Sequence, residues 1–291
     1  MKHPTIPWLI IALKLIDITA NQTIQNQMQS DLRASKDIIC RVQLAQILSA
    51  SFLEKLPTSG ESLRYCQSMQ QRRRDRSKLI LPNTNDLQKW ADQKHSSFLV
   101  TESSTSQAAK DFLVELLQVI REARFPVLWA LRFADYWESD LTCIDILRML
   151  VLQALQINPD ALTTGSNPIT MTHLREAVDE TDWLSILNRA LQGVQQIYIV
   201  LDADLLSHVT NHNRYLATRW IEGFPRTITG TVVKLFVSRY GVDEGYASRN
   251  WDSGGWVKLR TGMMGKRPPI RSKRQKPGST SRYNFGRAHR L

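Results

Sequence analysis

The amino-acid sequence predicts an α/β fold: a short parallel sheet flanked by helices, with a helical N-terminal region and a disordered basic tail. Two observations indicate the sheet. Short apolar runs alternate with longer segments of helical periodicity, which is typical of parallel strands covered by helices on both faces. The most informative run, residues 197–201, leads directly into Asp202, as expected of a buried parallel strand that ends in a carboxylate.

Residues 1–94 form the predicted helical N-terminal region. Residues 7–20 carry apolar side chains at helical spacing, so we expect an amphipathic helix packed on the protein. A secretory signal peptide is the alternative, although Lys14 and Asp17 interrupt the segment, which is also too short to span a membrane. Further helices are predicted over residues 32–53 and 61–76.

Residues 95–245 form the predicted α/β domain. Its helices are expected over residues 106–124, 144–157, 174–191 and 216–221. Its strands are expected over residues 98–100, 127–131, 197–201 and 232–237.

The charge of the chain is concentrated at its C-terminus. The net charge is +11, yet residues 253–291 hold 11 Lys and Arg and no acid, and residues 1–252 balance 27 basic against 27 acidic side chains. Residues 246–291 are also rich in Gly, Pro and Ser, so they cannot bury enough apolar area to fold and are predicted to be disordered. Basic side chains between residues 258 and 290 could bind nucleic acid, and the cluster Lys266–Arg274 could direct nuclear import.

The three cysteines, Cys40, Cys66 and Cys143, form no CxxC pair and are odd in number. They predict reduced intracellular thiols and no metal site. His208 and His212 would share a helix face, but no third ligand accompanies them, so they also predict no metal site.

The segment between the first strand and its helix is compared with a phosphate-binding loop, G-x-x-x-x-G-K-[ST]. Thr101 and Ser106 take the two glycine positions, Gln107 takes the lysine position, and Ala108 takes the hydroxyl position, so all four depart from the motif. Lys110 lies one helical turn further on, and we expect it not to replace the lost lysine. The hydroxyl-rich turn is interpreted as a helix cap, with weak phosphate binding at the helix N-terminus as the alternative.

Two further strands end in polar residues. Asp202 lies where nucleotidases hold an aspartate for Mg²⁺, and Asp204 is the only second carboxylate there. A lone aspartate at a strand end is also often a helix cap. Ser238 and Arg239, which end the fourth strand, resemble the polar tip of the sensor strand of signal-transduction P-loop NTPases.

The order of these segments resembles the NACHT-like STAND proteins of filamentous fungi, with the similarity covering roughly residues 30–240. Residues 147–160 resemble the helix after their second strand, and residues 183–203 resemble their approach to the acidic strand. The resemblance implies a P-loop-type sheet and a vestigial nucleotide site at Thr101, Ser106, Gln107, Ala108, Asp202, Asp204, Ser238 and Arg239. In complete relatives a winged-helix region follows, so we expect a truncated, motif-degenerate member or a C-terminus altered by a gene-model error.

The predicted function is non-catalytic: a protein-interaction or regulatory module that binds other proteins, with self-association as one form of this. We expect no enzyme activity, no cofactor, no membrane partner, and a metal only if Asp202 holds Mg²⁺. One alternative is a signalling switch that binds ATP or GTP weakly through Asp202, Arg239 and the Ser/Thr turn. Another is nucleic-acid binding through residues 258–290. The expected location is cytoplasmic, with the nucleus as the alternative.

Overall fold

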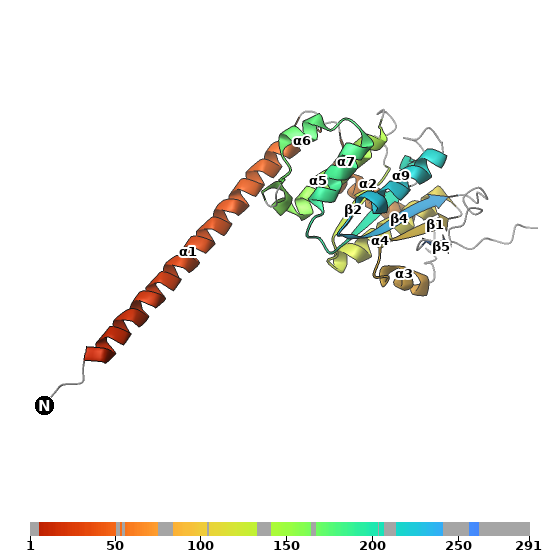
Figure 1. Cartoon of the computed structure of the whole chain (residues 1–291). Coiled ribbons are helices and arrows are strands. Elements are labelled where there is room, and N and C mark those ends of the chain that lie inside the picture. Colours follow the sequence, from red (N-terminus) through yellow and green to blue (C-terminus); the bar gives the residue numbers. More distant parts are fainter. Residues whose placement is uncertain are drawn as a thin grey trace, which may run out of the picture.

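The protein folds as a parallel sheet with helices on both faces, which confirms the predicted α/β class (Figure 1). This computed structural model describes residues 6–50, 53, 56–74, 84–103, 105–132, 141–163, 167–202, 204–206, 214–240 and 256–261. Side chains are described for these residues except 6–13, 15–17, 73–74, 84, 102, 214–219, 239–240 and 256–261.

The sheet has five described strands in the order β2-β3-β4-β1-β5, and every described pair is parallel. Their bounds are β1 Ser97–Ser103, β2 Val127–Ala130, β3 Gln196–Asp202, β4 Val232–Tyr240 and β5 Trp256–Thr261. Because β4 lies between β1 and β3, the carboxyl ends of these three strands lie next to one another at one edge of the sheet.

Strand β5 corrects the prediction that residues 246–291 form a disordered tail. Residues 256–261 pair along β1, with Leu99 opposite Val257 and Thr101 opposite Leu259. Residues 256–261 contain no glycine, and three of the six, Trp256, Val257 and Thr261, are of types that favour strands. The disorder prediction followed the flanking glycines and the basic residues further along the chain, which outweighed this short segment. The open edge of β1 supplies the backbone partners that complete the strand. Residues 262–291, the rest of the predicted tail, lie outside the described residues.

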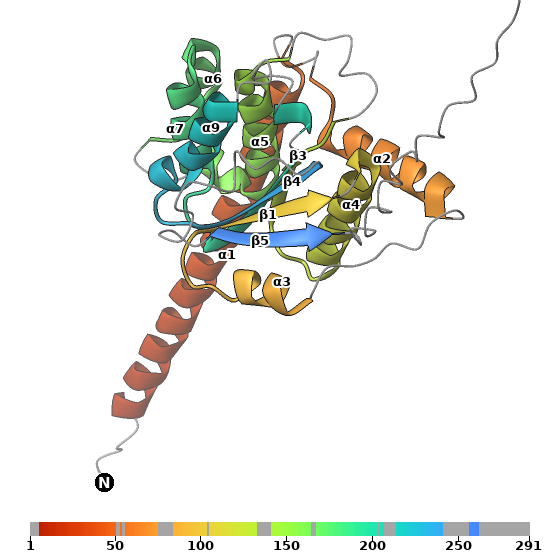
Figure 2. The same ribbon diagram turned by 90° about the vertical axis from the view of Figure 1, so that its right-hand side faces the viewer.

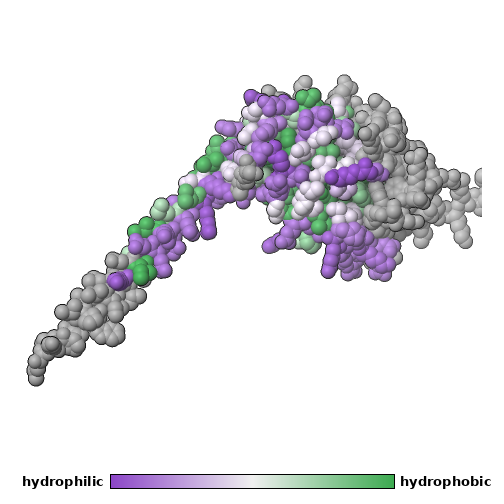
Figure 3. Space-filling model, in the orientation of Figure 1, coloured by the Kyte–Doolittle hydropathy of each residue, from purple (hydrophilic) through white to green (hydrophobic). Residues whose placement is uncertain are grey.

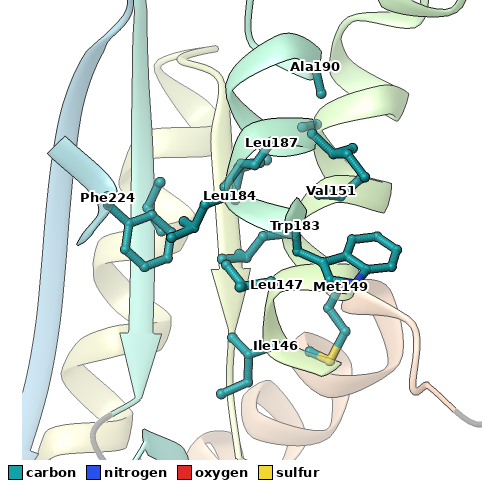
Figure 4. Close-up of a cluster of buried hydrophobic side chains, with 14 of the residues drawn as sticks. Ile146, Leu147, Met149, Val151, Trp183, Leu184, Leu187, Ala190 and Phe224 are labelled. Atoms are coloured by element: carbon teal, nitrogen blue, oxygen red, sulfur yellow. The ribbon is translucent and has the colours of Figure 1, made fainter. Parts of the chain in front are cut away.

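One face of the sheet is covered by α5 Cys143–Ile157, α7 Glu180–Ala190 and α9 Arg214–Thr227 (Figure 2). The short elements η2 Pro159–Leu162 and α6 Met171–Glu176 extend this layer. Figure 4 shows its interior, where side chains from α5 and α7 interdigitate beside Phe224 of α9. These helices place a continuous apolar layer under β3 and β4.

The helix predicted over residues 174–191 is in fact two helices, α6 and α7. Asp179 begins α7 with a capping box, in which its side chain accepts from the backbone N–H of Asp182 and the Asp182 side chain accepts from the N–H of Asp179. Ala177, at the C-terminus of α6, has the extended value ψ 114. A pair of acidic residues three apart is a helix-start signal, and here it overrides the apolar periodicity that runs through both helices.

The opposite face is covered by α2 Ser59–Arg74, α3 Thr84–Ala91 and α4 Ser106–Glu122. Trp90 of α3 packs edge-on against Tyr198 and Phe236, with ring centroids 5.7 and 6.3 Å apart. Leu63 of α2 belongs to the same buried cluster. The α/β core therefore includes helices from before residue 95, where the sequence placed the start of that domain.

Helix α1 Ile6–Leu48 is continuous, where the sequence predicted separate helices over residues 7–20 and 32–53. Its C-terminal part packs on the body through the buried side chains of Cys40 and Ile47. The rest extends away from the body in Figures 1 and 2. Ile18, expected on a packed face, is 53% exposed, so the amphipathic pattern marks an apolar face that no other described residue covers. Among the described residues, no helix combines the length and apolar content that a membrane crossing requires.

Candidate functional site

The carboxyl edge of the sheet brings three predicted site residues into one row. Thr101 of β1 is the register partner of Ser238 of β4, and Ser238 is the partner of Asp202 of β3. All three are buried. Helix α4 begins directly above this row, at Ser106. The parallel topology thus places the residues where a nucleotide phosphate and its Mg²⁺ would bind in a P-loop protein.

In the turn before α4, a side chain of the turn itself occupies a backbone N–H group that could otherwise bind an anion. Thr105 is the N-cap residue, and its hydroxyl accepts from the backbone N–H of Ala108 at 3.1 Å. That N–H is among those which a phosphate loop directs at its anion. Gln107, at the lysine position, is exposed to solvent. The turn is therefore a capped helix start, as the sequence interpretation favoured.

Asp202 and Asp204 occupy the centre of the edge. Asp202 is 4% exposed, and its Oδ1 accepts from the backbone N–H of Asp204 at 2.9 Å. Its Oδ2 accepts from the backbone N–H of Arg132 at 3.3 Å. Asp204 accepts from the Ser106 hydroxyl at 2.7 Å. Both carboxylates are thus bonded within the protein.

Lys110 supplies the positive charge at this edge. Its ammonium lies 3.7 Å from Oδ2 of Asp204, with about three quarters of the Lys110 side chain buried. Lys110 was not expected to replace the lost lysine, because it lies a helical turn beyond the loop position. Its long side chain reaches back over that turn, since helical side chains point toward the helix N-terminus. In this structure the lysine binds the acidic residues of the edge.

Burial raises the pKa of the Asp202 carboxyl from 3.8 to about 6. Lys110 is the strongest influence in the other direction, Asp204 adds repulsion, and the two backbone N–H donors favour the charged form. Asp202 therefore changes charge near neutral pH, a property of groups at functional edges and of buried ionic clusters alike.

The remaining predicted residues have different environments. The Ser238 hydroxyl donates to the backbone carbonyl of Ala109 at 3.2 Å, which ties β4 to α4. The Thr101 hydroxyl is fully buried and has no hydrogen-bond partner among the described residues. Arg239 is described only by its backbone, which pairs with Glu102 of β1. The position of its side chain lies outside the described part of the chain.

The sequence analysis missed Arg132, which lies just beyond β2. Its backbone N–H contacts Asp202, and its guanidinium Nη1 donates to the carbonyl of Asp204 at 3.4 Å. The predicted strand over residues 127–131 could have indicated Arg132, because the residue after a parallel strand lies at the same edge of the sheet as Asp202.

A Mg²⁺-bound nucleotide does not fit these residues as they are arranged. It would need free backbone N–H groups at the turn, a free cation and carboxylates open to the metal. Here Ala108 donates to Thr105, Lys110 is engaged with Asp204, and Asp202 is capped by backbone donors. The described residues also contain no group of three His, Cys, Asp or Glu side chains that could hold a metal ion.

Comparison with known proteins gives a structural similarity only. No protein-family model matches the chain, and no curated protein matches it. Among solved structures, the chain is similar to the ORC2 protein of Aeropyrum pernix, solved as ADPNP-ADP complexes, at 14% identity and a TM-score of 0.34. The alignment covers 74% of this chain and 51% of that protein, so this chain spans about half its length. The parallel sheet described above, with helices on both faces, is consistent with a P-loop NTPase-like fold.

Proposed function

We propose that this chain is a non-catalytic regulatory or protein-interaction module, built on a P-loop NTPase-like fold of the NACHT-like STAND type. The observation that carries the proposal is the contact of Lys110 and Ser106 with Asp204. In a working NTPase the lysine and hydroxyl of the loop and the aspartate at the strand end bind phosphate and metal. Here Gln107 and Ala108 hold the two loop positions. The nearby Lys110 and Ser106 bind Asp204, so we infer that the edge supports the fold rather than a reaction.

A bound nucleotide would have to displace two contacts that the protein already makes. Binding of a phosphate by Lys110 competes with its ion pair to Asp204, and binding by the turn competes with the Thr105 cap. The solvent-screened pair of Lys110 with Asp204 contributes about 1 kcal/mol, and the neutral Thr105 cap contributes about 1 kcal/mol. Losing both weakens affinity by roughly one to two orders of magnitude, and Gln107 supplies no ammonium at the lysine position of the loop. We therefore expect ATP and GTP affinities no tighter than the millimolar range.

The test is titration calorimetry of the full chain with Mg-ATP and Mg-GTP, together with a phosphate-release assay. The expected result is no saturable heat below about 1 mM nucleotide and no turnover. Asp37→Ala, an exposed substitution on α1, is the control for Asp202→Ala. Micromolar binding that Asp202→Ala removes and Asp37→Ala retains would overturn the proposal.

A second candidate function, a weak nucleotide-binding switch, is favoured by one observation. The Thr101 hydroxyl is buried at the edge without a described partner, and Lys110 provides a cation nearby. In this alternative, Lys110→Met abolishes nucleotide binding, whereas Gln107→Met, at the exposed lysine position of the motif, has no effect. The reverse ranking would contradict it.

Nucleic-acid binding through residues 258–290 and the cytoplasmic or nuclear location stay predictions. Strand β5 includes Lys258 and Arg260, but their side chains and residues 262–291 lie outside what the structure describes. If the tail binds nucleic acid, deletion of residues 262–291 removes binding and the full chain loses affinity steeply with salt.

A further inference from the structure

Helix α1 packs on the body only through its C-terminal part, and the part before it extends away from the body. From Lys36 onward it contacts the body: the Lys36 ammonium lies 2.9 Å from Asp160, and Cys40 hydrogen-bonds Thr163 through their side chains at 3.1 Å. Every described side chain from residue 18 to residue 35 is exposed. A single helix in water is only marginally stable, because most helical stability in proteins comes from packing.

The exposed part of α1 carries an apolar stripe, which we call the α1 stripe. Its six side chains are each half or more exposed: Ile24, Met28, Leu32, Ile38, Ile39 and Val42. Figure 3 shows hydrophobic side chains along this helix. With Leu32 at position a of a heptad, the six residues occupy a, d and g positions only. This is the pattern by which one helix packs along another.

The position of the α1 stripe around the helix leaves room for a second copy. At about 100° per residue, the stripe is centred roughly 110° from the face that packs on the body. In a two-fold parallel pair of α1 helices, the two bodies therefore lie on opposite sides of the pair.

The charges beside the α1 stripe favour pairing with an identical helix. Among the e and g positions over residues 22–43, Asp31 at g and Lys36 at e are the charged ones; the others are Gln22, Ile24, Gln29, Ile38 and Gln43. A parallel, in-register pair places each g residue opposite the following e residue of the other helix. Asp31 then faces Lys36 of the second copy, on both sides. Lys36 has three N–H donors, so it can keep its bond to Asp160.

We propose that the α1 stripe binds the α1 stripe of a second copy, forming a parallel, in-register two-stranded coiled coil over residues 24–42 and hence a homodimer. Gln25 and Ser35 occupy a and d positions in this arrangement. Polar residues there weaken a coiled coil but define its register. The proposal is independent of whether the carboxyl edge binds nucleotide.

The first test is sedimentation equilibrium of the full chain over a range of concentrations. The wild type is expected to reach twice the chain mass. Leu32→Asp, which places two like charges at the centre of the stripe, is expected to raise the dimer dissociation constant at least tenfold. Ala34→Asp is the matched control, because Ala34 is exposed on the same helix away from the stripe. Circular dichroism checks that both variants stay folded.

The second test addresses orientation. Ser35→Cys places the thiols of a parallel, in-register pair opposite each other, so mild oxidation should give a covalent dimer, whereas Ala34→Cys should not. A wild type that stays monomeric overturns the proposal, as does a dimer that Leu32→Asp leaves intact. A dimer that Leu32→Asp dissociates but Ser35→Cys fails to cross-link overturns the parallel register.

Discussion

The two ends of the sheet both bury charge, and they do so in different ways. Near the amino end of β4, Lys234 is fully buried. At the carboxyl end, four residues further along the same strand, Ser238 lies beside buried Asp202. The first site surrounds one charge with neutral groups, and the second holds a small cluster of opposite charges.

The amino-end site is a cap for helix α3. The Lys234 ammonium donates to the backbone carbonyls of Trp90, Gln93 and His95 and to the Ser97 hydroxyl. Cations are stabilised at helix C-termini, where carbonyl groups lack partners. Burial lowers the pKa of Lys234, while the negative charge of Asp92 acts in the opposite direction. Backbone carbonyls and one hydroxyl therefore hold this charge, and none of these acceptors changes charge with pH.

The carboxyl-end cluster is adjustable by comparison. The charge of Asp202 depends on pH near neutrality, and Lys110 and Asp204 are partly open to solvent. The comparison teaches that a buried charge held by backbone carbonyls has a structural role. A cluster of titratable groups at the carboxyl edge is the place where a ligand or proton could still act.

The largest expected loss of stability follows from a substitution near the amino end of β4. Lys234→Met removes a cation from at least three backbone carbonyls and leaves them buried without a donor. We expect a loss of about 3–5 kcal/mol in the free energy of unfolding, measured by urea denaturation. Lys94→Met, an exposed lysine in the loop that follows α3, is the control and should cost less than about 0.5 kcal/mol. A loss below about 1 kcal/mol for Lys234→Met would show that the cap is dispensable.

The next effect concerns the pH dependence of Asp202. Its pKa is higher folded, about 6, than the ordinary 3.8, so the folded state binds more protons between these values. The stabilisation of the folded state by the protonated Asp202 carboxyl is complete below about pH 4. It is lost as pH rises through about 6. Asp202→Asn lacks this titration, so wild-type stability relative to the variant should fall by about 2 kcal/mol from pH 4 to pH 7. A pH-independent difference would contradict the raised pKa.

A smaller effect is expected from Lys110. Lys110→Met removes the strongest influence that favours the Asp202 carboxylate, so the pKa of Asp202 should rise above its present value of about 6. Because Lys110 is 27% exposed, solvent screens the pair, and the stability loss at pH 7 should be about 1 kcal/mol. Proton titration followed by NMR of the Asp202 carboxyl measures the shift. Lys89→Met, which disrupts a largely exposed pair with Asp86, is the control and should leave that pKa unchanged.

The smallest effect is expected from the Ser106 hydroxyl. Ser106→Ala removes one hydrogen bond to Asp204 at a partly exposed position, and water can replace it. The expected loss is about 0.5 kcal/mol, measured by thermal unfolding, with exposed Ser30→Ala as the neutral comparison. A loss above about 2 kcal/mol would mean that the cluster is less adjustable than the comparison suggests.

The sequence by itself determined the α/β class and the approximate positions of four strands, because buried parallel strands are short apolar runs separated by helical segments. It also predicted that Thr101, Asp202 and Ser238 lie at the ends of strands. Strand ends are local features, and the parallel rule then places them at one edge.

Only the tertiary structure decided which groups meet at that edge and which strands lie at the two sides of the sheet. Lys110 reaches Asp204 because a long side chain spans a helical turn, and β5 joins the sheet because β1 offers it an open edge. Gln153, a polar residue in the apolar α5, bonds both the N–H and the carbonyl of Trp129 on edge strand β2, as a neighbouring strand would. Each of these contacts joins residues that are far apart in the sequence but close in space. Local sequence patterns therefore do not encode them.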